Sequence, residues 1–284
     1  MIPAAFEYHR PSDIAAALSI LTEYGDDARV IAGGHSLVPM MKLRMAEVPH
    51  LIDLQDIGTL RGIDVGADRI RIGAMTTQHD LINHDALTNA APTIRETALQ
   101  IADPQVRYMG TIGGNVANGD PGNDMPALMQ CLDATFYLTG PNGERTVSAR
   151  EFYFAAYATD REDDEILTAI EFAHPMPGFA YEKQKRKIGD YATAAAAVLI
   201  QRDGERCTGA SIAMTNLSDT PVFAEDAAAT LVGTAVDSAA IAAAIEAMQQ
   251  AIDPSEDNRG PVPFKRHIAG VVLQRAIERA WSRA

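Results

Sequence analysis

Cysteine is nearly absent from this sequence, which has only Cys131 and Cys207 among its 284 residues. Two cysteines are too few for a framework of several disulfides. They are also too few for an iron-sulfur cluster, which is usually held by four cysteine thiolates. Any cluster on an electron path through this protein must therefore lie on another chain.

The sequence also lacks a long uninterrupted apolar run. The longest candidate, Ala192–Ile200, is roughly half of the ~20 residues that cross a bilayer. The N-terminus has no basic segment followed by an apolar core, so neither a signal peptide nor a transit peptide is expected. These features predict a cytoplasmic protein.

Positive charge is in short supply, with 24 Lys and Arg against 38 Asp and Glu and a formal net charge of -14. Nucleic acids and anionic membrane surfaces reward clustered Lys and Arg, so nucleic acid is not an expected partner. One basic run, Lys183–Lys187, stands out. At least half of its side chains should be solvated, but one or two could neutralise cofactor phosphates or meet an acidic partner.

The hydrophobic pattern predicts an α+β protein in three parts. Residues 12–24 have helical spacing behind a Ser12 cap, and a strand at 28–32, a helix at 37–45 and a strand at 50–54 follow. Two short strands around a turn at 66–68 predict a hairpin, and helices and strands are mixed as far as residue 172.

A domain boundary is expected near residue 176, because Pro175, Pro177 and Gly178 interrupt a strand pattern there. Strands at 193–200 and 207–215 and Ala-rich helices at 224–231, 238–251 and 264–283 follow it. The predicted division is 1–56, 57–176 and 177–284.

Two glycine pairs are placed where a strand is expected to give way to a turn. The first glycine segment is Ala32-Gly33-Gly34-His35-Ser36-Leu37, and the second is Gly110-Thr111-Ile112-Gly113-Gly114-Asn115. Without a Cβ, glycine lets backbone N–H groups approach a diphosphate closely, and Ser36, Thr111 and Asn115 add short hydrogen-bonding side chains. Both segments are therefore candidates for phosphate binding.

Neither segment matches a common nucleotide-binding motif. No G-x-G-x-x-G and no G-x-x-x-x-G-K-[ST] occurs, which disfavours a Rossmann site and a P-loop. A tight turn without a ligand explains either glycine pair alone. The two together favour a flavin site built in another way.

The strings AGGHSL, TIGGN, GNDMPA and KIGDYATAAAA, in this order, resemble the FAD-binding subunit of the xanthine oxidase family of molybdenum hydroxylases. The similarity runs from Met1 to the C-terminal helix. Two longer strings, IADPQVRYMGTIGGNVANGDPGNDMPALMQC and YEKQKRKIGDYATAAAAV, resemble the branch of that family whose complexes oxidise carbon monoxide. Other branches act on aldehydes or N-heterocycles.

This resemblance implies a vanillyl-alcohol-oxidase-type fold, in which two α/β sub-domains hold an extended FAD and a smaller α+β C-terminal domain follows. The two glycine segments would bind the pyrophosphate. Asp124 and Leu167 would contact the ribityl, ribose or adenine parts, and Lys185 and Tyr191 would approach the isoalloxazine ring. No catalytic residue and no metal ligand is identified on this chain.

Three assignments have alternatives that the sequence leaves open. Asp124 could simply cap the helix that begins near Met125. Tyr191 could be a core aromatic rather than a shield over one flavin face. His35 invites a catalytic interpretation, but its position in a backbone loop favours packing or hydrogen bonding.

The resemblance also implies partner chains. A large subunit would carry the molybdopterin-type molybdenum centre and a small subunit the 2Fe-2S clusters, in a dimer of heterotrimers. Electrons would pass from the clusters to FAD and then to a quinone or another external acceptor, with the assembled complex able to lie against the inner face of the membrane. A free-standing flavin oxidase and a scaffold without cofactor are the competing hypotheses.

Overall fold

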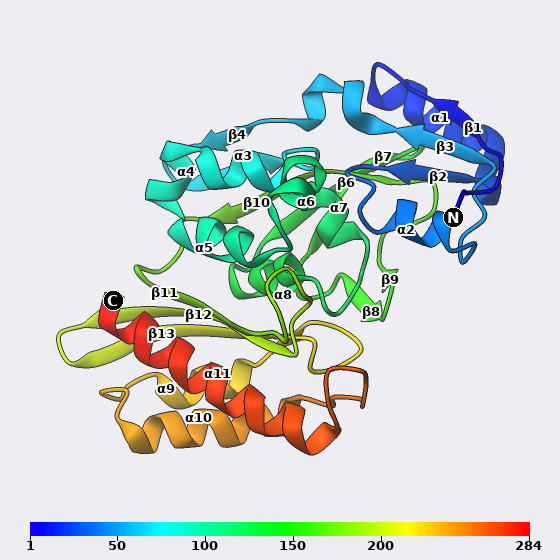
Figure 1. Cartoon of the computed structure of the whole chain (residues 1–284). Helices are drawn as coiled ribbons and strands as arrows, with labels where there is room; N and C mark the ends of the chain where they lie inside the picture. The colour runs from blue at the N-terminus through cyan, green and yellow to red at the C-terminus, as the bar shows by residue number, and fades with distance from the viewer.

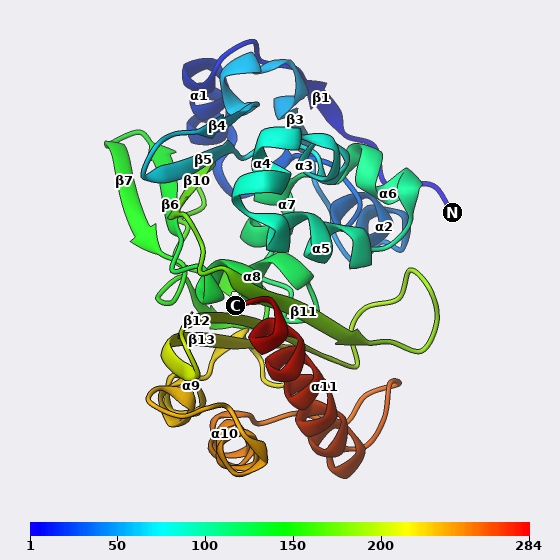
Figure 2. The same cartoon turned by 90° about the vertical axis from the view of Figure 1, so that its left-hand side faces the viewer.

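The computed structural model describes all 284 residues, Met1–Ala284. They form a three-stranded parallel sheet, a five-stranded antiparallel sheet, a four-stranded antiparallel sheet and one two-stranded pairing, with helices around them (Figures 1 and 2). The predicted α+β class is confirmed. No helix has both the length and the apolar composition of a membrane span.

The N-terminal sheet has the order β1-β3-β2 and carries helices on both faces. Its elements are β1 (Glu7–His9), α1 (Ile14–Tyr24), β2 (Ala28–Ile31), α2 (Leu37–Lys42) and β3 (His50–Asp53), with 3-10 turns at Gly25–Asp27, Leu54–Asp56 and Gly58–Leu60. The predicted Ser12 cap is wrong: Asp13 caps α1 and accepts a hydrogen bond from the backbone N of Ala16 at 2.8 Å. Strand β1 was not predicted, because three residues show no periodicity.

The middle sheet has the order β4-β5-β10-β6-β7, and the predicted hairpin is its β4–β5 edge. Its strands are β4 (Ile63–Val65), β5 (Arg69–Gly73), β6 (Thr135–Gly140), β7 (Gly143–Ser148) and β10 (Ile166–Ala173); β8 (Tyr153–Ala155) pairs with β9 (Ala158–Thr159). The helices are α3 (Gln78–Asn83), α4 (Asp85–Ala90), α5 (Pro92–Gln100), α6 (Pro104–Met109), α7 (Ile112–Ala117) and α8 (Asp124–Cys131). Helices α4, α6 and α7 were missed, since six residues hold less than two helical turns.

The C-terminal sheet has the order β11-β12-β13-β14 and lies between the middle part and three helices (Figure 1). It consists of β11 (Gly178–Gln184), β12 (Ala194–Asp203), β13 (Arg206–Thr215) and β14 (Val222–Phe223); the helices are α9 (Glu225–Leu231), α10 (Ser238–Ala251) and α11 (Val262–Arg283). In β12, Ala195, Ala197 and Leu199 face the middle core, while the alternate residues face the helices. Burial on both faces explains the continuous apolar run.

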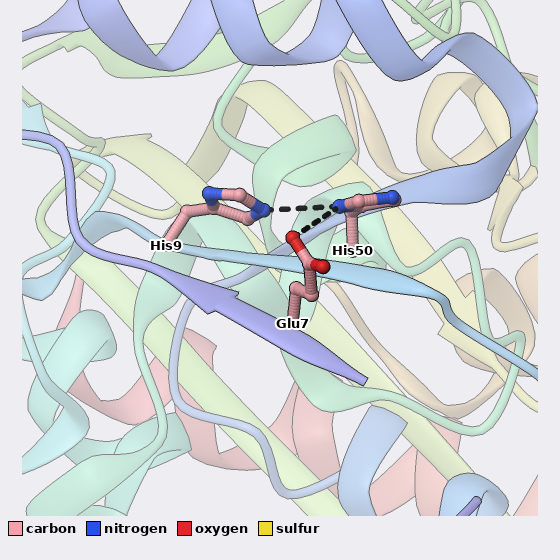
Figure 3. A group of neighbouring side chains, drawn as sticks. All are labelled: Glu7, His9 and His50. Carbon is pink, nitrogen blue, oxygen red and sulfur yellow. Dashed lines mark hydrogen bonds and ion pairs between the residues drawn. The ribbon is translucent and has the colours of Figure 1, made fainter. Parts of the chain in front are cut away.

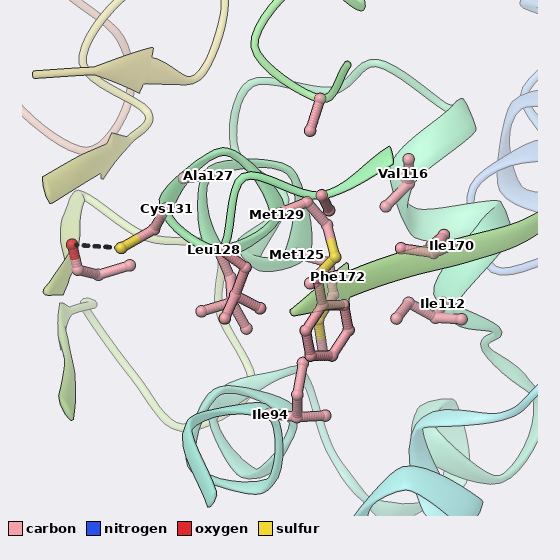
Figure 4. Close-up of a cluster of buried hydrophobic side chains, with 14 of the residues drawn as sticks. Ile94, Ile112, Val116, Met125, Ala127, Leu128, Met129, Cys131, Ile170 and Phe172 are labelled. Carbon is pink, nitrogen blue, oxygen red and sulfur yellow. Dashed lines mark hydrogen bonds between the residues drawn. The ribbon is translucent and has the colours of Figure 1, made fainter. Parts of the chain in front are cut away.

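Helix α8 lies at the centre of the largest core and joins the middle part to the C-terminal sheet. Side chains from α5, α7 and β10 surround it (Figure 4). On its other side, the Cys131 thiol is 3.5 Å from the carbonyl oxygen of Ala197 in β12. Burial raises the pKa of Cys131 to about 12, so this thiol is a packing group and not a nucleophile. The position of α8 fixes Asp124, its first residue, between the two parts.

Candidate functional site

A cavity of about 430 Å³ opens between the N-terminal, middle and C-terminal parts of the chain. Most of its lining comes from four stretches, 28–37, 101–124, 161–167 and 183–191. This volume is in the range of small-molecule and cofactor sites. The cavity is therefore the candidate functional site, and the two glycine segments meet in it.

The first glycine segment leaves the carboxyl end of β2 and enters α2, the position at which open α/β sheets bind ligands. The backbone N–H groups of the four successive residues Gly33–Ser36 donate no hydrogen bond within the chain. The side chains of His35 and Ser36 also make no hydrogen bond, and both line the cavity. Successive unpaired N–H groups on a cavity wall can donate to the oxygens of an anionic ligand, so this segment is suited to hold hydrogen-bond acceptors.

Two glycines of this segment are required by its geometry. Gly34 has a φ of 75°, a left-handed conformation that side chains disfavour. A Cβ on Gly33 would overlap the carbonyl oxygen of Met109 and lie 2.6 Å from the Cα of Gly110. The first segment therefore packs directly against the start of the second.

The second glycine segment differs from the prediction, because it connects α6 to α7 and does not follow a strand. Thr111 caps α7, and its hydroxyl accepts a hydrogen bond from the Gly114 N at 3.0 Å. Nearly all other N–H groups of the segment donate within the chain, including Ile112 to Thr76 and Gly113 to Ala74. Most of these amides are therefore already paired within the chain, although the segment lines the cavity.

The glycines of the second segment serve close packing instead. A Cβ on Gly113 would lie 2.5 Å from the Cβ of Ala74, and one on Gly114 would lie 3.2 Å from the Cβ of Ala32. Asn115 accepts a hydrogen bond from the backbone N of Met125, so it holds the start of α8. The segment forms a cavity wall on which the first segment rests.

Two amide side chains on the cavity wall have buried atoms without a hydrogen-bond partner. Gln78 is 1% exposed, and neither its Nε2 nor its Oε1 has a partner in the chain. Asn118 is half-buried, and its Nδ2 has no partner in the chain. Such groups are costly unless something satisfies them. Sequence reasoning missed both, because a polar residue on a short helix normally indicates a solvated face.

Asp124 does not cap α8, so the capping alternative is wrong. Its Oδ1 accepts a hydrogen bond from the Tyr181 hydroxyl at 2.6 Å, and its Oδ2 lies 2.8 Å from the Lys183 Nζ. The side chains of Asp124 and Lys183 are only 6% and 1% exposed. Burial raises the pKa of Asp124, and the Lys183 charge offsets part of that rise.

The buried cation of this site is Lys183, which the sequence analysis did not single out. Lys183 lines the cavity, whereas Lys185 lies outside it and donates to the Oε1 of Gln100 at 2.9 Å. Tyr181 and Lys183 share one face of β11, because side chains alternate along a strand, and Lys185 follows directly after the strand. The alternation in FAYEKQK was the signal that could have found Lys183.

Tyr191 and Leu167 both line the cavity, but Tyr191 is exposed and Leu167 is buried. Tyr191 is 41% exposed and belongs to no core cluster, so the core alternative is wrong. The Arg259 guanidinium lies 5.4 Å from its ring centre. Leu167 on β10 is buried, beside Ile166 and Glu165.

The structure brings almost all of the predicted contact residues to this one cavity. Only two of them do not line it: Ile112, whose side chain is in the core, and Lys185. Arg161 is a further wall residue that was not predicted, and burial lowers the pKa of its guanidinium. It lies in the polar stretch 160–165, which carries no periodic signal.

Comparison with known proteins gives matches over the whole chain. Residues 4–175 match the family described as the FAD binding domain in molybdopterin dehydrogenase, and residues 179–280 match the CO dehydrogenase flavoprotein C-terminal domain. The carbon monoxide dehydrogenase medium chain of Afipia carboxidovorans is 57% identical, over 100% of this chain and 99% of that protein.

Two further comparisons bear on fold and on substrate. A crystal structure of a Cu,Mo-CO dehydrogenase in its cyanide-inactivated form contains a chain that is 57% identical, with a TM-score of 0.98 over 100% of both chains. The glyceraldehyde dehydrogenase medium chain of Sulfolobus acidocaldarius is 31% identical over 98% of this chain and 99% of that one.

Proposed function

The chain belongs to the family of FAD-binding subunits of molybdopterin dehydrogenases, and we propose that it is the electron-transferring medium subunit of a carbon monoxide dehydrogenase. The family sets the cofactor as FAD. The identity of 57% to a carbon monoxide dehydrogenase chain, against 31% to a glyceraldehyde dehydrogenase chain, supports carbon monoxide as the substrate of the complex. An aldehyde-oxidising complex is the alternative.

One observation carries the cofactor assignment: the unused hydrogen-bonding groups of the cavity wall. The free N–H groups of Gly33–Ser36 can donate hydrogen bonds to phosphate oxygens without supplying a formal positive charge. The unpaired amide of Gln78 offers a donor and an acceptor on the same wall. These groups suit an elongated ligand with a diphosphate and several polar atoms.

We propose the following contacts for FAD along this cavity. The first glycine segment binds the pyrophosphate, with Gly110 and Thr111–Asn115 forming the wall behind it. Leu167 contacts the adenosine half, and Tyr191 covers one face of the isoalloxazine ring. Lys183 and Asp124 present a buried ion pair to the flavin end, and the charge of Lys185, outside the cavity, adds to the attraction on Asp124.

Bound FAD supplies the electron-transfer chemistry. The chain has to exclude water and to hold the ring near a donor and an acceptor, so it needs no acid or base of its own. We propose that electrons arrive from 2Fe-2S clusters of a small subunit, downstream of the molybdenum centre of a large subunit, in a dimer of heterotrimers. A quinone at the inner face of the membrane is the proposed acceptor.

We also keep the three-part division 1–56, 57–176 and 177–284 as a proposal. Each part is built around its own sheet, which supports this division. The cavity takes its walls from all three, so cofactor binding would tie them together. Limited proteolysis with and without FAD would test the boundaries.

The function is tested by co-expressing this chain with its two partner subunits and reducing the purified complex with carbon monoxide. We expect about one FAD per medium chain on extraction and bleaching of the flavin absorbance under carbon monoxide. Bleaching by an aldehyde but not by carbon monoxide would show that the chain belongs to an aldehyde-oxidising complex instead. An isolated chain that oxidises small alcohols by itself would contradict the subunit role.

Replacing Gln78 by Leu separates a cofactor contact from a structural role. The side chain has no partner in the chain, so Gln78→Leu removes an unpaired polar group and should leave the apo chain at least as stable. FAD affinity should fall by roughly tenfold, the equivalent of one lost hydrogen bond. Thermal unfolding of the apo chain and FAD titration by fluorescence measure the two effects.

Thr97 provides the matched control for this prediction. Its hydroxyl is also buried without a partner, but it does not line the cavity. Thr97→Val should therefore change the stability in the same direction and leave FAD affinity unaltered. Equal FAD affinity in the wild type and in Gln78→Leu would remove Gln78 from the site.

A further inference from the structure

Two histidines and one glutamate converge at the edge of the N-terminal sheet, away from the cavity. The Nε2 of His9 lies 3.1 Å from the Nδ1 of His50, and this Nδ1 lies 3.7 Å from the Oε2 of Glu7. All three donor atoms are within 4.8 Å of one another. Figure 3 shows the side chains pointing toward a common point.

The backbone places these three side chains on one face. Strands β1 and β3 are parallel, and Glu7 is opposite His50 in their register. His9 follows Glu7 by two residues, so both project to the same side of β1. This arrangement is fixed by strand pairing and does not depend on a flexible loop.

Aromatic packing orients the imidazole rings. The Tyr24 ring at the end of α1 is stacked on His50 with ring centres 3.7 Å apart and planes at 12°, and it also contacts His9 at 5.7 Å. His50 is only 17% exposed at its side chain, whereas Glu7 is 72% exposed. Two ligands are therefore held in place, and the third is free to adjust.

We infer that Glu7, His9 and His50 form a binding site for a divalent transition-metal ion of the zinc type. Zinc takes imidazole nitrogen and carboxylate oxygen at about 2.0–2.2 Å, which sets neighbouring donors in a tetrahedral site about 3.3 Å apart. The observed separations of 3.1 and 3.7 Å are close to that value. A site with three protein ligands keeps one position for water.

The same contacts can hold an ion in place of the hydrogen bond. A hydrogen bond between His9 and His50 needs one proton between the two nitrogens, and a metal ion takes the place of that proton. The carboxylate of Glu7 then binds the ion instead of facing solvent. The strongly negative chain favours a bound cation electrostatically.

The proposed ion would cross-link β1, through Glu7 and His9, to His50, the first residue of β3. None of Glu7, His9 and His50 lines the FAD cavity, so the proposed ion and the cofactor would share no ligand. Metal binding should therefore stabilise the N-terminal strand without changing FAD content. This separation makes its test independent of the proposed function.

The test is zinc titration of the untagged full chain by calorimetry, with metal content measured after dialysis. We expect one Zn²⁺ per chain and a rise in the unfolding temperature that a chelator reverses. His9→Ala/His50→Ala should weaken binding by at least about 100-fold, because it removes two direct ligands. His267→Ala, which removes an exposed histidine on α11, should bind like the wild type.

Binding of Co²⁺ provides a second readout. A visible absorption typical of low-coordinate cobalt should appear in the wild type and be lost in His9→Ala/His50→Ala, with the same FAD content in both. If the wild type binds no more zinc than the double variant, the three residues are a hydrogen-bonded cluster only and the inference is overturned. Retention of full affinity in the double variant would also overturn it.

Discussion

Replacing Gly33 by Ala should weaken FAD binding and lower the FAD content of the purified chain. A Cβ at this position would overlap the Met109 carbonyl oxygen and approach the Gly110 Cα to 2.6 Å, and both atoms belong to backbone that cannot move alone. Overpacking of this kind costs about 1–3 kcal/mol. The first glycine segment must shift away from the wall, and its free N–H groups then lose their alignment.

The expected loss in FAD affinity is between about tenfold and 100-fold, at about 1.4 kcal/mol per tenfold. FAD per chain after gel filtration measures it, and far-ultraviolet circular dichroism reports whether the fold persists. Gly58→Ala is the matched control, because a Cβ at Gly58 meets no atom within 4 Å. Full FAD occupancy in Gly33→Ala would remove the first glycine segment from the phosphate site.

Gly33 and Gly113 differ in a way that the sequence could not predict. Both pairs were correctly placed at one cavity, because glycine signals a close backbone approach. The sequence could not tell what each glycine approaches. For Gly33 the neighbour is the second segment and its own N–H groups stay free, whereas for Gly113 the neighbour is Ala74 and the N–H group is already bonded.

The fold was predictable wherever periodicity was long, as in β12, α10 and α11. Several short elements, β1, α4, α6 and α7, were not, and two of these, α6 and α7, flank the second glycine segment. Lys183 was not predicted as a site residue for a related reason. A run of five polar residues indicates a solvated face, whereas the side-chain alternation that buries Lys183 is set by the pairing of β11 with β12. Tertiary contacts, and not local sequence, determine both the short helices and the burial of Lys183.

Lys183→Met should give the largest loss of stability among single substitutions at this site. It leaves the Asp124 carboxylate buried without its cation, and breaking a buried pair costs about 3–5 kcal/mol. The free energy of unfolding in urea measures this loss. Lys187→Met, at an exposed position of the same run, should stay within about 0.5 kcal/mol of the wild type.

The pH dependence of Lys183→Met identifies Asp124 as the cause. Burial raises the folded-state pKa of Asp124 above its ordinary 3.8, and loss of the Lys183 charge raises it further. Between the unfolded and folded pKa values the folded chain holds more protons, so stability is fully present below pH 3.8 and falls as pH rises, by at most about 1.4 kcal/mol per unit. The variant should therefore be closer to the wild type at pH 5 than at pH 8.

Adding Asp124→Asn to Lys183→Met tests this account in the same experiment. Without a titrating group the extra pH slope should disappear, and most of the lost stability should return, because no charge is left buried alone. The amide retains an oxygen for the Tyr181 hydroxyl, so the remaining contact is preserved. A double variant as unstable and as pH-dependent as Lys183→Met would mean that Lys183 acts through packing and not through the carboxylate that it faces.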